Sequence, residues 1–158
     1  MKITPENVQF IMGHEPVASD ALADTSDWVC LKGAEGVLIL VSEYTAGGDT
    51  DLVLTVHESS DGSGTTALTT GAEFPIWVNT DATAGSSFTR QTDAVTYTID
   101  ATTTKNYLVV FDIPASILSA GCDWVQLGAS GGNASNIVSV TYILYGVRYQ
   151  QADIPSAL

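Results

Sequence analysis

Apolar and polar residues alternate along several short segments of this chain. "DLVLTVHES" (51–59), "FPIWVNT" (74–80) and "AVTYTID" (94–100) alternate with a period of two, which is the pattern of a β-strand with one buried face. "NIVSVTYILYGVRYQ" (136–150) continues the alternation over a longer stretch. We therefore predict half-buried strands in these segments.

Two other segments are apolar at consecutive positions and rich in β-branched residues: "GVLILVSEY" (36–44) and "NYLVVFDIP" (106–114). This composition is typical of a central strand that is buried on both faces. We therefore expect these two segments to lie in the middle of a sheet.

The segments between the predicted strands are rich in Gly, Asp, Ser and Thr, as in "TAGGDTD" (45–51) and "GASGGNAS" (128–135). These residues favour turns. No helical periodicity is sustained, and only "PASILSAG" (114–121) is expected to form a single helical turn. Short strands separated by turns predict an all-β fold.

We predict an antiparallel two-sheet β-sandwich, either a jelly roll or an immunoglobulin-like sandwich, with an extended N-terminal arm. Residues 1–27 are assigned to the arm because Pro5 and Pro16 interrupt them and "VQFIM" is their only apolar piece. Residues 28–150 form the β-sandwich domain, and residues 151–158 are a C-terminal tail. The sequence leaves the strand order open.

The motif Asp-Trp-Val-x-Leu occurs twice, at 27–31 and at 123–127, each time followed by a glycine-containing break and a long apolar strand. We interpret both regions as hairpins, and we expect the motif to serve the same structural role in each rather than to mark a duplicated functional site. Cys30 and Cys122 lie next to the two motifs, so the motifs are candidates for spatial neighbours. Whether the two thiols pair is left open, because a disulfide also depends on geometry.

Charge excludes some partners. The 158 residues contain 5 Lys and Arg against 18 Asp and Glu, a formal net charge of -13. Such a chain repels nucleic acid and anionic membranes. No signal peptide and no long apolar run is present in the sequence. We therefore expect synthesis in a cytoplasm and no nucleic acid or membrane partner.

Residues that would carry catalysis or metal binding are scarce. His14 and His57 have no sequence companions that form a known motif, and both are expected to be solvated surface imidazoles. We expect no catalytic residues, no enzyme activity and no cofactor. Asp49, Asp51 and Asp61 are candidate calcium ligands. Turn chemistry also accounts for these aspartates, and none matches EF-hand spacing.

Trp77 is a candidate contact residue. Alternation within "FPIWVNT" points it away from the core face, and a large exposed ring is a candidate for stacking on a sugar or anchoring a protein interface. The alternative is that another part of the chain covers Trp77.

The phrases "ESSDGSG", "FDIPASILSAGCDWVQL" and "YGVRYQ" occur in this order. Together they resemble the β-sandwich capsid decoration proteins of tailed bacteriophages, also called cement or auxiliary head proteins, over residues 28–150. The resemblance implies a non-enzymatic protein on the capsid exterior of the virion. It would bind the major capsid protein, stabilise the shell and form a homotrimer.

Within this resemblance the arm is expected to become ordered on binding, with Val8, Phe10 and Ile11 as its anchors. Deleting residues 1–20 would then abolish capsid binding and leave the sandwich folded.

Two other functions remain open at this point. A carbohydrate- or receptor-binding module of a tail or fibre predicts an aromatic platform of Trp77 with Tyr44, Tyr97 or Tyr107. A neck, head-to-tail or baseplate connector predicts a ring of higher order.

Overall fold

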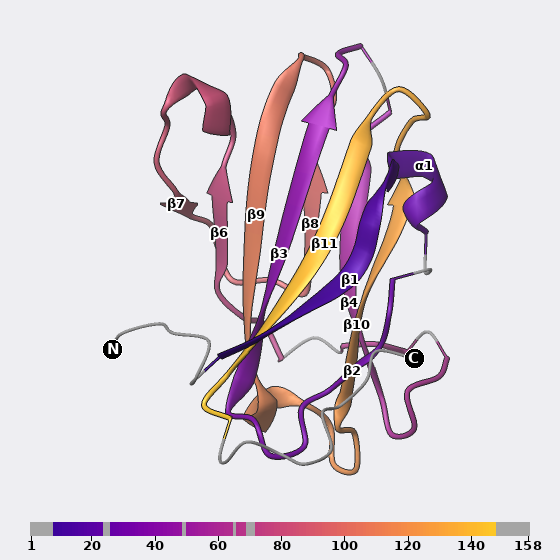
Figure 1. Cartoon of the computed structure of the whole chain (residues 1–158), viewed down its shortest axis with the longest axis vertical. Coiled ribbons are helices and arrows are strands. Elements are labelled where there is room, and N and C mark those ends of the chain that lie inside the picture. The colour runs from indigo at the N-terminus through magenta and orange to yellow at the C-terminus, as the bar shows by residue number, and fades with distance from the viewer. Residues whose placement is uncertain (1–7, 24–25, 49, 65, 69–71, 148–158) are drawn as a thin grey trace.

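A computed structural model describes residues 8–23, 26–48, 50–64, 66–68 and 72–147. The chain folds into two antiparallel sheets that pack face to face (Figure 1). The larger sheet contains, in spatial order, β1 (Val8–Ala18), β11 (Ile137–Tyr145), β3 (Gly36–Thr45), β9 (Lys105–Pro114), β6 (Ile76–Asn79) and β7 (Thr89–Arg90). The smaller sheet contains β2 (Val29–Cys30), β10 (Trp124–Gly131), β4 (Leu52–Ser59) and β5 (Thr66–Ala67), with β8 (Thr96–Ile99) also paired to β4.

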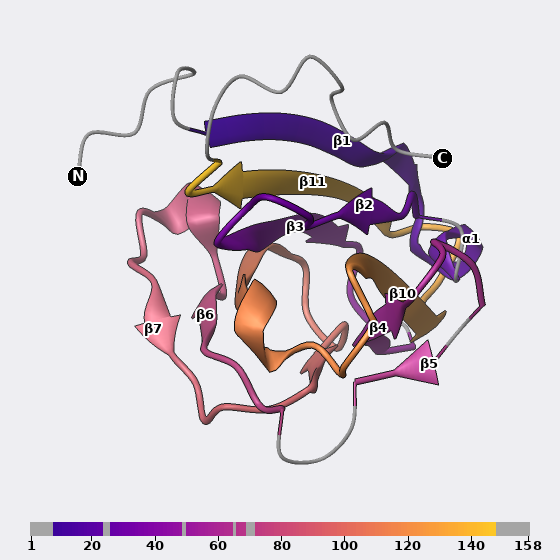
Figure 2. The same ribbon diagram turned by 90° about the horizontal axis from the view of Figure 1, so that it is seen from below.

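The strand order is that of a jelly roll. Without β5, β6 and β7, the sheets read β1-β11-β3-β9 and β2-β10-β4-β8. Successive strands of the chain therefore alternate between the two sheets, except that β4 and β8 are neighbours in the smaller sheet. Strands β5, β6 and β7 all belong to the connection from β4 to β8. Figure 2 shows the larger sheet curving around one side of the core and the smaller sheet closing the other side. The all-β sandwich prediction is confirmed.

The predicted half-buried strands are present as β4, β6, β8 and β11. In β4, Leu52, Leu54 and Val56 are fully buried, as is Leu127, the partner of Val56 on β10. In β11, Val138, Val140 and Tyr142 are fully buried in the same way. The period-two pattern therefore identified the inward face of each of these two strands.

Helical structure is short. It consists of α1 (Ser19–Leu22), η1 (Ala82–Ala84) and η2 (Ala115–Ile117). The turn expected in residues 114–121 corresponds to η2, which follows Pro114.

The prediction that residues 36–44 and 106–114 are buried on both faces is wrong for one face. β3 and β9 do lie in the middle of the larger sheet. Their inward residues are fully buried, but Leu38 and Leu40 of β3 and Leu108 and Val110 of β9 are only half-buried. In Figure 1 β1 crosses the lower ends of these strands, and no described element is drawn over their upper parts. The apolar pattern reflects a second face that the described residues leave partly open.

Much of the expected arm belongs to the sandwich. Residues 8–18 form β1, which pairs with β11 from Val8↔Tyr145 to Ala18↔Ile137. The alternation is hard to read in sequence because β-bulges interrupt the register after Met12 and after His14. Residues 1–7 lie outside the described residues. Deleting residues 1–20 would therefore remove an edge strand and part of α1.

The two Asp-Trp-Val motifs are hydrogen-bonded to each other. Val29 and Cys30 of β2 pair antiparallel with Val125 and Trp124 of β10. The predicted hairpins are wrong, because β2 and β10 lie in the smaller sheet while the strands that follow them, β3 and β11, lie in the larger one. The expectation that the motifs are spatial neighbours agrees with this pairing, and the thiols of Cys30 and Cys122 are free.

Candidate binding face

The outward side of the larger sheet brings apolar residues from five strands into rows. Antiparallel pairing places Met12, Thr141, Leu40, Val110 and Trp77 directly opposite one another across β1, β11, β3, β9 and β6. Directly opposed residues point to the same side of a sheet. With neighbouring strands about 4.8 Å apart, this row spans about 19 Å.

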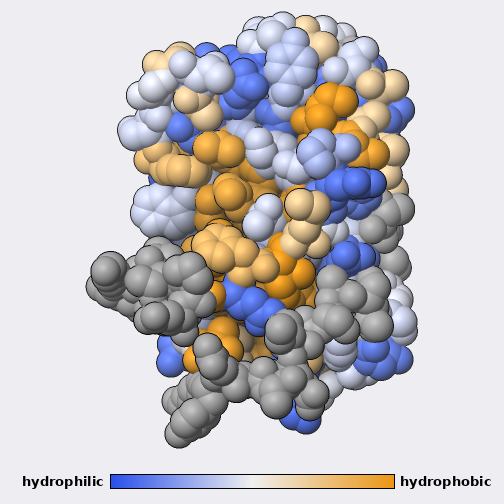
Figure 3. All heavy atoms as spheres, viewed as in Figure 1, coloured by the Kyte–Doolittle hydropathy of each residue, from blue (hydrophilic) through white to orange (hydrophobic). Residues whose placement is uncertain are grey.

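A second row runs parallel to the first and contains Phe10, Ile143, Leu38 and Asp112. We define the outer face as the apolar residues of these two rows together with the neighbouring outward Leu108: Phe10, Met12, Leu38, Leu40, Trp77, Leu108, Val110 and Ile143. Figure 3 shows hydrophobic side chains gathered on this side of the molecule.

Exposure is greatest at the two edges of the outer face. Met12 is 66% exposed and Phe10 57% exposed on β1, and Trp77 is 38% exposed on β6. The central leucines and valines are half-buried by their neighbours in the sheet. Three large apolar side chains therefore project from a largely apolar floor.

Charge is sparse within the rows. Asp112 is the charged residue of the second row, and its carboxylate accepts a hydrogen bond of 2.9 Å from the Tyr145 hydroxyl. Burial, together with the neighbouring Asp112 and Glu35 carboxyls, raises the pKa of Tyr145. Arg90 of β7 lies opposite Trp77 and forms an ion pair of 2.7 Å with Asp93. The cation beside Trp77 is thus paired.

The four predicted partner contacts divide into two groups. Phe10 and Trp77 lie on the outer face and are exposed. Ile11 points to the other side of β1 and packs against the core, while Val8 is on the same side as Phe10 but is only 6% exposed. Met12 was not predicted as a contact, although it is the most exposed large hydrophobic residue in the described part of the chain and its spacing of two from Phe10 places it on the same side of the strand.

The predicted aromatic platform is not assembled among the described residues. Tyr44 shares the outward side of the larger sheet but lies opposite Asn106, four residues along β9 from the partner of Trp77. Tyr107 points inward and is 4% exposed. Tyr97 belongs to β8 in the smaller sheet. Trp77 therefore has aliphatic rather than aromatic neighbours in its row.

The candidate calcium ligands are used in local structure. The Asp51 carboxylate accepts a hydrogen bond from the Ala101 N–H at 2.9 Å. Asp61 accepts hydrogen bonds from Ser59 and Ser63, and these bonds lower its pKa. Asp49 lies outside the described residues, and within those residues no group of three acidic, His or Cys side chains is arranged to hold a metal ion.

The two histidines differ from each other. His14 is only partly exposed, and its Nδ1 lies 2.8 Å from the backbone oxygen of Glu15. His57 is 7% exposed, so its predicted place on the solvated surface is wrong. It faces outward from β4, between its strand partners Gln126 of β10 and Ala67 of β5.

Sequence analysis also missed a buried carboxyl group. Glu43 is 1% exposed, and among the described residues neither of its carboxylate oxygens has a hydrogen-bond partner by geometry. Burial, opposed by the nearby Ser19 hydroxyl and reinforced by the charge of Asp51, raises the pKa of Glu43 to about 7. The signal was present in the sequence, because Glu43 continues the inward series of Val37, Ile39 and Val41.

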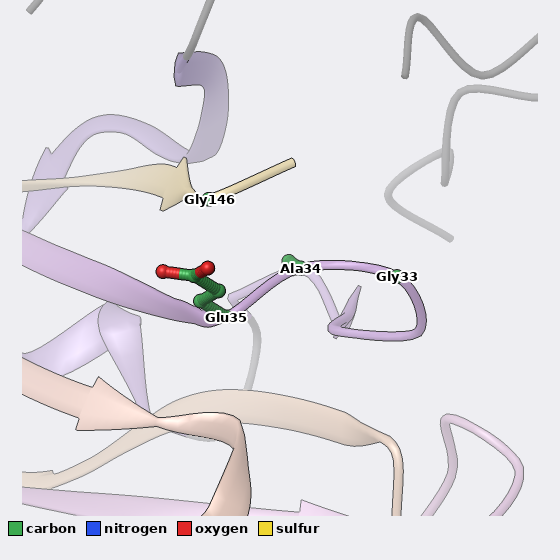
Figure 4. Close-up of a pocket in the computed structure, with 4 residues that line it drawn as sticks. All are labelled: Gly33, Ala34, Glu35 and Gly146. Carbon is green, nitrogen blue, oxygen red and sulfur yellow. The ribbon is translucent and has the colours of Figure 1, made fainter. Parts of the chain in front are cut away.

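A small hollow lies at the end of the larger sheet. It has a volume of about 220 Å³ and is lined by Gly33, Ala34, Glu35 and Gly146. Figure 4 shows the Glu35 carboxylate beside Gly146. A single carboxylate provides no acid–base pair, so this lining does not define a catalytic site.

The fold and the outer face define a class: a jelly-roll β-sandwich with an apolar, partly exposed face on its larger sheet. No model of a known protein family matches the chain, and a search of curated proteins finds no match. None of the helices in the described part of the chain is long and apolar enough to cross a membrane.

Proposed function

We propose that this protein is a non-enzymatic decoration protein that binds the outer surface of a tailed-phage capsid and stabilises the shell. The observation that carries the proposal is the outer face. Apolar surface that is removed from water on docking contributes about 25 cal/mol per Å² before the costs of association. An apolar face on a stable scaffold therefore suits a protein that adds to a preformed surface.

The fold and the charge support the same function. Jelly rolls are frequent in viral shells, although they also occur in lectins and in enzymes. A formal net charge of -13 favours solubility at the high concentrations reached before assembly. We propose the major capsid protein as the partner and the virion exterior as the location. Homotrimer formation remains a prediction from the family resemblance.

A second candidate is a tail, fibre or neck protein that binds a receptor or a carbohydrate. The exposure of Trp77 favours it, because a tryptophan ring can stack on a sugar. The aliphatic surroundings of Trp77 support it less well than a cluster of aromatic rings would. Capsid decoration therefore explains more residues of the outer face than carbohydrate binding does.

The test is the copy number of this protein in purified virus particles from its source, measured by quantitative mass spectrometry relative to the major capsid protein. A ratio typical of an abundant shell component supports decoration of the capsid. A few copies per particle would instead favour the tail or neck, and complete absence from particles would refute both.

A further inference from the structure

We propose that the outer face binds a protein surface with an apolar centre and basic groups around it, and that an acidic rim on this chain selects that surface. This inference rests on the proposed function and adds the chemistry of the partner. It follows from the apolar residues in the rows of the outer face and from the acidic residues around them.

The first step concerns the centre of the outer face. Antiparallel sheets commonly bury one side and present polar residues on the other. Here β3 and β9 present Leu38, Leu40 and Val110 on the second side. These residues form the floor between the exposed Met12 and Trp77. A partner that removes this surface from water must itself be apolar at its centre.

Acidic residues lie beyond the two rows, farther along the strands that form them. Glu15 is exposed on β1, Glu35 is exposed immediately before β3, and Asp81 follows β6. With Asp112 of β9, these residues form what we call the acidic rim. Figure 3 shows hydrophilic side chains bordering the apolar region.

The described basic residues do not balance the acidic rim. Arg90 is paired with Asp93. Lys105 lies over the ring of Tyr107, 6.0 Å from the centroid, on the inward side of β9. Lys32 lies in the turn between β2 and β3. Among the described residues, the four acidic side chains of the rim therefore outnumber Lys32, and the charge bordering the outer face is negative.

The third step decides between partners. Two copies that met through this face would place acidic rims against each other, and like charges brought together cost free energy and slow the encounter. With a partner that has Lys or Arg around its apolar centre, attraction between opposite charges stabilises the complex and speeds the encounter. Charge thus disfavours a second copy at this face and favours a different, basic-rimmed protein surface. Trimers, if formed, would use another surface.

The experiment measures association with capsid shells prepared from particles that lack this protein. The association rate constant is determined at 50, 150 and 500 mM NaCl. The rim variants are Glu15→Lys and Glu35→Lys. The matched control is Asp123→Lys, which makes the same change in charge at an exposed residue preceding β10 in the smaller sheet.

We expect the wild-type rate constant to fall about tenfold between the lowest and highest salt, because screening weakens steering. Each rim variant should associate several-fold more slowly than wild type at 50 mM NaCl and show a weaker salt dependence. Asp123→Lys should differ from wild type by less than twofold. Thermal unfolding checks that all variants are folded.

Three results would overturn the inference. The first is a salt-independent association rate for wild type, and the second is equal slowing by the rim and control variants. The third is a wild-type dimer in light scattering that Met12→Lys dissociates, since the face would then bind a second copy. Shell binding with any of these results leaves the proposed function intact. Failure of wild type to bind shells at all refutes both.

Discussion

The hydroxyl of Tyr142 on β11 accepts a hydrogen bond of 3.0 Å from the backbone N–H of Leu127 on β10. This contact joins the two sheets through the core. β2 pairs only with Trp124 and Val125, so the N–H of Leu127 lies beyond the end of β2. The Ser26 hydroxyl donates to the carbonyl of Leu127 and lies 3.1 Å from the Tyr142 hydroxyl. Side chains thus replace the missing strand partner.

Tyr142→Phe tests this relationship. The variant keeps the ring but leaves the buried N–H of Leu127 without its acceptor. We expect the free energy of unfolding to fall by about 1–3 kcal/mol, measured by urea denaturation. Burial raises the pKa of Tyr142 to about 12, so the hydroxyl remains protonated at neutral pH. Tyr44→Phe, at an exposed tyrosine, is the control and should change stability little. Equal stability of wild type and Tyr142→Phe would contradict the role of the contact.

Glu43→Gln tests the buried carboxyl. The folded state raises the pKa of Glu43 from its ordinary value of 4.5 to about 7. Between these pH values the folded protein holds a proton that the unfolded chain has released. The contribution of Glu43 to stability therefore falls as pH rises through this window and levels off above it. In Glu43→Gln no carboxyl group titrates at this position, so the variant should not lose stability in this pH window.

We expect Glu43→Gln to exceed wild type in free energy of unfolding by about 1–3 kcal/mol at pH 8 and to approach it at pH 4.5. Urea denaturation at several pH values measures the difference. Glu15→Gln, at an exposed position, should show no such window. A wild-type minus variant difference that does not change with pH would show that Glu43 is not the group responsible.

The strands and the class of fold were predictable because period-two alternation records which side of each strand is buried. The jelly-roll order was not, since it depends on contacts between segments far apart in sequence. The repeated Asp-Trp-Val motif is an example of such a contact. Trp28 and Trp124 marked equivalent segments correctly, but only the pairing of Cys30 with Trp124 shows that the two segments meet in one sheet.

The candidate face was predictable in part. Trp77 was placed on the outward side by alternation, and the doubly apolar patterns of β3 and β9 indicated a second face. β1 was assigned to an arm because Pro16 and two bulges obscure its periodicity, so the side of β1 on which each anchor lies could not be assigned. As a result Ile11 was proposed as a contact although it packs against the core, and Met12 was missed.

The two cysteines provide a test of whether their thiols are free in the folded protein. Both are free thiols, and Cys30 lies opposite Trp124. Burial and the nearby Glu58 and Asp123 carboxylates raise the pKa of Cys122, which leaves less reactive thiolate at neutral pH. We expect alkylation of the native protein without reductant to add two adducts, with Cys122 reacting more slowly than a cysteine in a short peptide. An intact mass lower by two hydrogen atoms, with no adduct, would show a disulfide instead.

Lysine substitutions on the outer face separate binding from folding. Phe10→Lys and Trp77→Lys place a charge at exposed positions. Phe10→Lys should change the free energy of unfolding by less than about 1 kcal/mol, whereas Trp77→Lys should lower it by about 1–3 kcal/mol because Trp77 is only 38% exposed. Docking would bury the new charge among apolar groups, and we expect each variant to lose about 30-fold or more in affinity for capsid shells. Thr98→Lys adds the same charge at an exposed position of β8, on the outward side of the smaller sheet. It should bind like wild type. Wild-type affinity in both outer-face variants would exclude this face as the docking surface, and equal loss in all three would point to net charge rather than to the face.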